Sequence, residues 1–228
     1  MPGQITNSGL RDNHSRGIVA DFLKAKIQPG SRLSVVSAYF TIYAYEALKE
    51  HLDQIEHLDF LFGEPTSVTR LDPSKTEKKA FLIDTDGLEL VNRLQQKRVA
   101  KECADWIEEK VDIKTIRQSN LLHGKMYHVS AGGVEDAILG SSNFTVRGLG
   151  LGDAGNNIEL NLIVDSTRDR HELKQWFNEV WNDGKLSKRF AVELFPEKWS
   201  IRTHNILSSR CSRPVISSAV SGSITTRC

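Results

Sequence analysis

The sequence is poor in cysteine, with only Cys103, Cys211 and Cys228, and none of them lies in a C-x-x-C pair or at metal-ligand spacing from a histidine. An odd number without such spacing argues against both a disulfide framework and a structural zinc site. The chain also lacks any apolar run near the ~20 residues that cross a bilayer, and its first residues lack the apolar core of a signal peptide. These absences predict a cytoplasmic protein with no membrane partner.

An excess of charge of one sign is missing as well. The 30 lysines and arginines balance 29 aspartates and glutamates, which leaves a formal net charge of +1. No global basic field attracts polyanions, so binding of phosphate must come from a local cluster. The chain has no G-x-x-x-x-G-K-[ST] nucleotide loop, which excludes an ATP-driven motor.

What the sequence does contain is enough apolar material for one sizeable core, because 39% of its 228 residues are hydrophobic. The predicted strands are 32–41, 58–63, 111–117, 125–131, 136–144 and 156–164, and the predicted helices are 43–55, 88–110 and 165–184. This order is typical of an α/β fold with a mixed β-sheet flanked by helices. We divide the chain into an N-terminal arm (1–14), a domain (15–185), a connecting segment (186–201) and a Ser/Arg-rich tail predicted to be disordered (202–228).

The first residues with chemical potential are His123 and Lys125. They are two positions apart, so on an extended strand both side chains emerge on the same face. An isolated H-x-K of this kind usually reflects only two polar residues on the solvent-exposed face of a half-buried strand. His128 has an odd offset from His123 and is expected on the opposite face.

The next predicted strand ends in small polar residues. Ser141 and Asn143 again have a two-residue spacing, which predicts that both lie on one face at the rim of the sheet. Arg147, four residues beyond Asn143, is a candidate contact for a substrate phosphate at the edge of this site.

A third strand supplies a carboxylate. Glu159 is expected to share the face of the site with Asn157 and Asn161. The alternating aliphatic residues are then expected to point into the core, namely Ile158, Leu160 and Leu162.

These residue types fit one reaction. The imidazole of His123 can attack a phosphodiester to form a phosphohistidine. Lys125 and the amide of Asn143 can hold the non-bridging oxygens, and Ser141 can donate a further hydrogen bond. Glu159 can orient an imidazole through its other ring nitrogen. This reaction requires no metal or other cofactor. The carboxylate pairs that hold two metal ions in many nucleases are absent from this segment.

The segments H-G-K (123–125), G-S-S-N-F-T (140–145) and N-N-I-E-L-N (156–161) together resemble the signature of the phospholipase D superfamily. The order of predicted elements resembles one half of that fold, and the spacing looks most like the phospholipase D-like domains of bacterial restriction nucleases and helicase-associated proteins. The resemblance implies a nuclease. One departure is that the aspartate expected five residues after the lysine is replaced by Ser130, and its role is not transferred to Asp136.

The chain has a single H-x-K, whereas the reaction needs one imidazole to attack and a second to protonate the leaving oxygen. A homodimer would supply the second across a two-fold axis. Nucleic acid, DNA rather than RNA, is the expected substrate, and a helicase or restriction-modification system is a candidate partner. Two alternatives stay open: a catalytically impaired module that binds nucleic acid, and a phospholipase or lipid transferase, which would need an apolar access surface.

Overall fold

The computed structural model describes residues 8–63, 93–117, 122–153, 155–189, 191–194 and 201–204. The helices are α1 (Val19–Lys26), α2 (Ile42–Leu52), α3 (Arg93–Lys110), α4 (Val146–Leu149) and α5 (Thr167–Asn182). The strands are β1 (Leu10–Arg11), β2 (Arg32–Ser37), β3 (His57–Phe62), β4 (Val111–Ile116), β5 (Lys125–Ala131), β6 (Val134–Gly140), β7 (Asn161–Ile163), β8 (Ser187–Arg189), β9 (Ala191–Leu194) and β10 (Ile201–His204).

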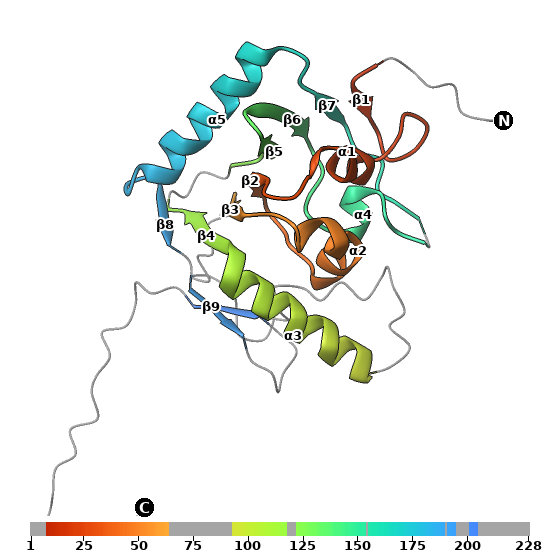
Figure 1. Cartoon of the computed structure of the whole chain (residues 1–228), viewed down its shortest axis with the longest axis vertical. Helices are drawn as coiled ribbons and strands as arrows, with labels where there is room; N and C mark the ends of the chain where they lie inside the picture. The colour runs from red at the N-terminus through yellow and green to blue at the C-terminus, as the bar shows by residue number, and fades with distance from the viewer. Residues whose placement is uncertain are drawn as a thin grey trace, which may run out of the picture.

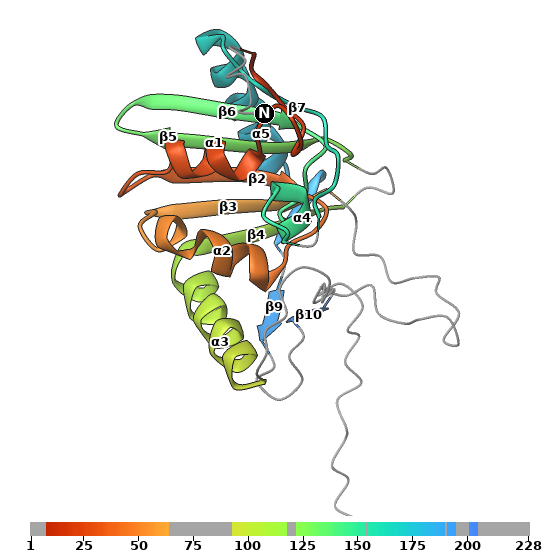
Figure 2. The same ribbon diagram turned by 90° about the vertical axis from the view of Figure 1, so that its right-hand side faces the viewer.

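Eight of these strands form one sheet in the order β1-β7-β6-β5-β2-β3-β4-β8. The three strands β2, β3 and β4 run parallel, and the remaining pairs in this sheet are antiparallel. Figure 1 shows α5 on one side of the sheet and α1, α2 and α4 on the other, and Figure 2 shows α1 and α2 in front of the strands. The predicted α/β class with a mixed sheet flanked by helices is therefore confirmed.

The two faces of the sheet are buried by different amounts. On the face covered by α1, α2, α3 and α4 lies the main core, in which Phe40, Phe60 and Phe144 pack ring against ring. On the other face, Phe177 of α5 packs in a much smaller cluster with Met126 and its neighbours on the central strands. The strands next to α5 therefore have a less complete apolar cover.

Local sequence signals explain the ends of several elements. Helix α2 begins after Thr41, whose side chain accepts a hydrogen bond from the amide of Ala44, and α5 begins after Ser166 in the same way. Strands β5 and β6 are joined by Gly132-Gly133, both with positive φ, which is the conformation of a two-residue hairpin turn. This turn fixes the register between β5 and β6 and thus the position of the site residues on them.

Part of the N-terminal arm pairs with the sheet. Leu10 and Arg11 form β1, which lies antiparallel to β7 opposite Leu162 and Asn161. Of the predicted tail, only the first residues fall within β10, and 205–228 lie outside the described residues. Within the described part of the chain, no helix combines the length and the apolar character that crossing a bilayer requires.

Candidate active site

The predicted site residues gather where β2 ends. The register pairs Met126 with Val36, near the C-terminal end of β2, and Lys125 with Gly140, at the last position of β6. His123 comes two residues before β5 begins, and its side chain is exposed to solvent. The Lys125 ammonium donates to the backbone carbonyl of His123 at 2.7 Å, so the two residues are held together by a local bond.

The loop after β6 differs from the prediction of a strand through residue 144. Strand β6 ends at Gly140, so Ser141 and Asn143 do not share one face of a strand. The Ser141 hydroxyl donates to the carboxylate of Glu159 and accepts from the amide of Leu160 at 3.0 Å. Ser141 and Glu159 are therefore brought together as the sequence led us to expect, but by a loop.

Asn143 turns away from Ser141 and toward β2. Its Oδ1 accepts from the amide of Ala38 at 3.0 Å and lies 3.2 Å from the Ser37 hydroxyl. The same hydroxyl accepts from the amide of Phe144 at 2.9 Å, and the amide of Thr41 donates to the carbonyl of Phe144. Oδ1 is therefore fixed by β2 and the residue that follows it, whereas Nδ2 donates to no described residue.

Asn161 is the residue whose role the sequence did not reveal. It is buried, and its Oδ1 accepts from the amides of both Ser141 and Ser142 at 3.1 Å. Its Nδ2 donates to the Ser142 hydroxyl at 2.9 Å and to the carbonyl of Arg11 at 3.2 Å. Asn161 thus holds the loop that carries Ser141 and Ser142 in place through four hydrogen bonds. The sequence contained a signal for this role, because an amide residue in N-N-I-E-L-N can bond to the exposed backbone of a loop such as G-S-S-N.

The expectation that Ile158, Leu160 and Leu162 point into the core is wrong. All three are exposed, and Asn161 between them is the residue that points inward. The physical reason is that the amides of Ser141 and Ser142 need a buried acceptor, which an amide side chain supplies and a leucine does not. Only Asn161–Ile163 of the predicted strand 156–164 form a strand, β7, and in it Leu162 points to the side opposite to Asn161.

Two further predicted positions are placed by short elements. Arg147 lies in the single turn of α4, which begins after Thr145 and follows the Asn143 loop directly. Ser130, in the position of the missing aspartate, lies on β5 opposite Arg32, at the start of β2. Five steps along the strand separate Ser130 from Lys125, about 17 Å, so Ser130 is too distant to touch the site.

Tyr127, which lies on β5 and contacts the loop after β6, is held in its neutral form by its surroundings. Burial raises the pKa of Tyr127, and the nearby charge of Glu159 raises it further. The Tyr127 hydroxyl accordingly remains protonated and donates to the carbonyl of Ser142 at 2.9 Å. This bond gives the loop a second buried support besides Asn161.

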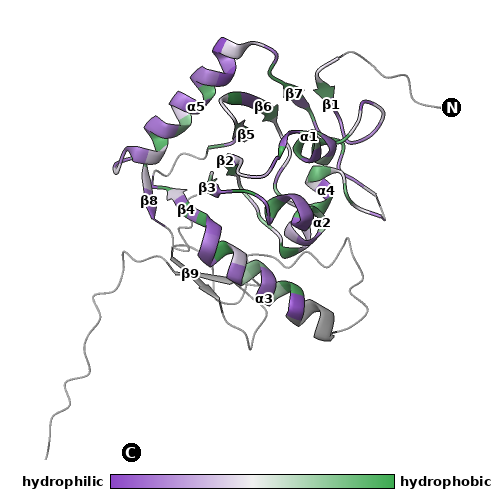
Figure 3. Cartoon of the chain, in the orientation of Figure 1, coloured by the Kyte–Doolittle hydropathy of each residue, from purple (hydrophilic) through white to green (hydrophobic). Residues whose placement is uncertain are grey.

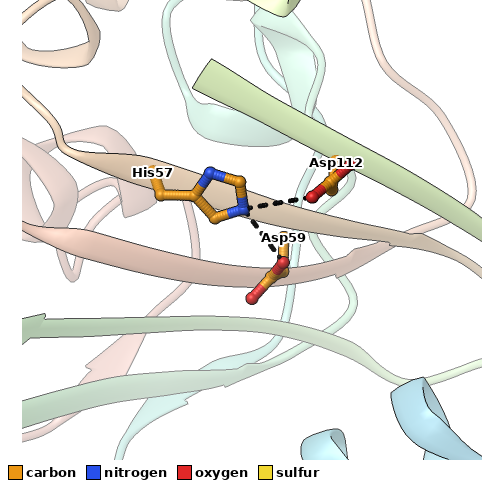
Figure 4. Close-up of side chains that lie close together, drawn as sticks. All are labelled: His57, Asp59 and Asp112. Carbon is orange, nitrogen blue, oxygen red and sulfur yellow. Dashed lines mark hydrogen bonds and ion pairs between the residues drawn. The ribbon is translucent and has the colours of Figure 1, made fainter. Parts of the chain in front are cut away.

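A separate cluster of potential metal ligands lies at the other end of the strands. The Nε2 of His57 is 3.2 Å from Asp59 Oδ1 and 3.7 Å from Asp112 Oδ2 (Figure 4). An imidazole and two carboxylates are donors that a divalent ion accepts, but Arg189 already pairs with Asp112 at 2.9 Å. His57 starts β3 and the site lies at the C-terminal end of β2, so this cluster takes no part in the chemistry of His123.

Comparisons with known proteins bear on the family and the fold of this domain. Residues 28–181, most of the chain, match the family model described as "Cardiolipin synthase, PLD-like domain". The fold resembles the crystal structure of polyphosphate kinase from Porphyromonas gingivalis with a TM-score of 0.52 at 12% identity, over 90% of this chain and 26% of the kinase. The chain therefore spans about a quarter of that enzyme's length. Comparison with curated proteins gives no sequence match.

Proposed function

Because the chain belongs to the phospholipase D-like family, we propose that it is a metal-independent phosphodiesterase that cleaves nucleic acid, DNA in preference to RNA, through a phosphohistidine. The observation that supports the proposal is the pair of contacts near the start of β5 and the end of β6: Lys125 bonds to the backbone of exposed His123, and Ser141 bonds to Glu159. A nucleophile, a cation and hydrogen-bonding groups around a phosphate are what this reaction requires.

In the proposed reaction, a neutral nitrogen of His123 attacks phosphorus. The N–P bond forms while the P–O bond to the leaving alcohol breaks, and the leaving oxygen takes a proton from a second imidazolium. The second imidazole then removes a proton from water, which attacks phosphorus and breaks the N–P bond. A phosphomonoester is released, and both imidazoles return to their starting states.

The surrounding side chains stabilise charge on the phosphoryl group. Lys125 and the Nδ2 of Asn143 are suited to the non-bridging oxygens, since the other atom of the Asn143 amide is fixed by Ala38. Ser141, whose hydroxyl donates to Glu159, is proposed to hold that carboxylate in place, and Arg147 is proposed to bind a neighbouring phosphate of the polymer. Glu159 is proposed to accept a hydrogen bond from the second imidazole and to favour its charged form.

The second imidazole is proposed to come from another copy of the chain, as the partner subunit's His123. His128 is unsuitable because it is buried, with only 1% of its side chain exposed, and His57 lies at the far end of β3. A two-fold axis would place two identical half-sites together. From the sequence resemblance we also propose that a helicase or a restriction-modification system acts with the dimer.

A phospholipid headgroup transferase is the second candidate function. The family model is described by the name cardiolipin synthase, and exposed aliphatic residues flank Glu159 at Ile158 and Leu160. Such a surface is what an acyl-chain substrate would contact. The chemistry at phosphorus would be the same, with an alcohol in place of water as the final acceptor.

The test uses end-labelled single- and double-stranded DNA, RNA, labelled phospholipid vesicles and polyphosphate, each with excess EDTA. We expect cleavage of DNA that survives EDTA, and loss of turnover in His123→Ala without a change in melting temperature. His171→Ala, an exposed histidine on α5, is the matched control and should remain active.

Each other outcome rejects a defined part of the proposal. A strict requirement for added magnesium contradicts the histidine mechanism. A gel shift without cleavage identifies an inactive module that binds nucleic acid. Turnover of phospholipid or polyphosphate alone leaves the mechanism in place but rejects nucleic acid as the substrate.

A further inference from the structure

Four large aliphatic side chains are exposed on β6, on β7 and on the segment that leads into β7, and we call them the aliphatic stripe. They are Ile158, Leu160, Leu162 and Leu139, with exposed fractions of 84%, 68%, 57% and 42%. Leu139 and Leu162 face one another across the β6–β7 pair, and Leu160 and Ile158 continue the alternation along the chain. Figure 3 shows hydrophobic residues on β6 and β7 beside the mostly hydrophilic α5.

The stripe is a continuation of the apolar face that α5 covers only in part. Met126 on β5 is buried beneath α5 together with Phe177, whereas Leu139, its cross-strand partner on β6, is exposed. Near the N-terminal end of α5, Arg170 instead donates to the carbonyl of Glu135, at the other end of β6. The apolar face therefore extends one strand beyond the helix that covers its centre.

The exposed area is comparable to that of the largest apolar patch on a typical monomer. Together the four residues expose roughly 400 Å², within the range of the largest, often functional, patch on a monomer. That is about half of the ~800 Å² that each partner contributes to a standard protein interface. A second copy of the same stripe would supply a matching apolar surface across a two-fold axis.

The position of the stripe links it to the site. The amide of Leu160 donates to the Ser141 hydroxyl, and the carbonyl of Leu160 accepts from the amide of Ser141. Glu159, which accepts from Ser141, lies between Leu160 and Ile158 in the chain. A partner bound to the stripe would therefore lie next to Ser141 and Glu159 of the proposed site.

We propose that the aliphatic stripe is the contact surface for a second copy of this chain. The inference rests on the proposed function in one respect, because the second imidazole of that reaction identifies the occupant as another copy. The exposed area and the self-complementary chemistry of the stripe support the same occupant. The dimer would bury Leu160 and Leu162 near its centre and bring the two half-sites together.

The experiment measures the mass of the chain by sedimentation over a wide concentration range, for the wild type and for Leu160→Asp. We expect a wild-type dimer and a dissociation constant that rises about 100-fold or more in the variant, because the two-fold axis introduces each charge twice. Val134→Asp is the matched control: Val134 is 60% exposed but lies next to the Gly132-Gly133 turn, at the other end of β6. It should remain dimeric, and Leu160→Asp should keep the melting temperature that the wild type has when it is diluted to the monomer.

A wild-type chain that stays monomeric at the highest concentration overturns the inference, and so does a Leu160→Asp chain that dimerises like Val134→Asp. A monomer that sediments with anionic phospholipid vesicles, and loses this binding in Leu160→Asp, would assign the stripe to lipid instead. Failure of the proposed function is distinguishable, because a stripe-dependent dimer that cleaves no phosphodiester keeps the interface and rejects only the reaction.

Discussion

Replacing Asn161 with alanine should destabilise the domain and disorganise the site loop without touching any proposed reacting group. The side chain takes part in four hydrogen bonds, to the amides of Ser141 and Ser142, the Ser142 hydroxyl and the Arg11 carbonyl. Alanine removes all four. The Ser141 amide keeps a second acceptor, the carbonyl of Leu160, at 3.1 Å.

The magnitude follows from which groups are left without a partner. The amide of buried Ser142 has no other acceptor among the described residues, and an orphaned buried donor costs about 1–3 kcal/mol. The bonds to the hydroxyl of Ser142 and the carbonyl of Arg11 add a smaller loss. We expect a decrease of about 3 kcal/mol in the free energy of unfolding, or roughly 6–12 °C in melting temperature.

Urea denaturation measures the free energy, and amide hydrogen exchange reports on the loop. The peptide that contains Ser141 and Ser142 should exchange faster in Asn161→Ala, and turnover should fall because Asn143 and Ser141 lose their fixed positions. Asn157→Ala is the control: Asn157 is exposed and bonds only to the Glu159 carboxylate through its side-chain Nδ2, at 3.1 Å. Its free energy of unfolding should stay within about 0.5 kcal/mol of the wild type.

A free energy of unfolding for Asn161→Ala as close to wild type as that of Asn157→Ala would refute the reasoning. It would mean that the hydrogen bonds of Asn161 do not stabilise the loop that contains Ser141 and Ser142. Unchanged hydrogen exchange at Ser142 would lead to the same conclusion, whatever happened to turnover.

Two other predictions concern the strands around the site. Burial lowers the pKa of His128, an effect that Glu135 opposes, so the unfolded imidazole binds a proton more readily than the folded one. The buried neutral imidazole therefore costs no stability above about pH 6.5, and the domain loses stability as the pH falls below that value. The melting temperature of His128→Leu should vary less between about pH 8 and pH 5 than that of the wild type. An equal change of melting temperature with pH in the two proteins would contradict this. Gly140→Ala should lower the melting temperature, because its Cβ would lie 2.6 Å from the Cα of Asn161. Gly124→Ala is the control, because Gly124 has open space around it. Equal melting temperatures of the two variants would contradict the prediction and show that β7 can move to accommodate the Cβ.

The sequence by itself determined the class of the fold and singled out the candidate residues of the site. Apolar patterns predicted six of the eight strands of the sheet, all but β1 and β8, and Gly132-Gly133 predicted the hairpin that sets the register of β5 and β6. These features depend on residues near one another in the chain, which is why local patterns were sufficient.

Only the tertiary structure decided which side of the N-N-I-E-L-N segment is buried. Period two shows that Ile158, Leu160 and Leu162 share a face, but it cannot say whether that face is the inner one. The choice depends on the amides of Ser141 and Ser142, some twenty residues away, which bond to Asn161. Long-range hydrogen-bond demand thus overrode hydrophobic alternation and left the aliphatic stripe on the surface.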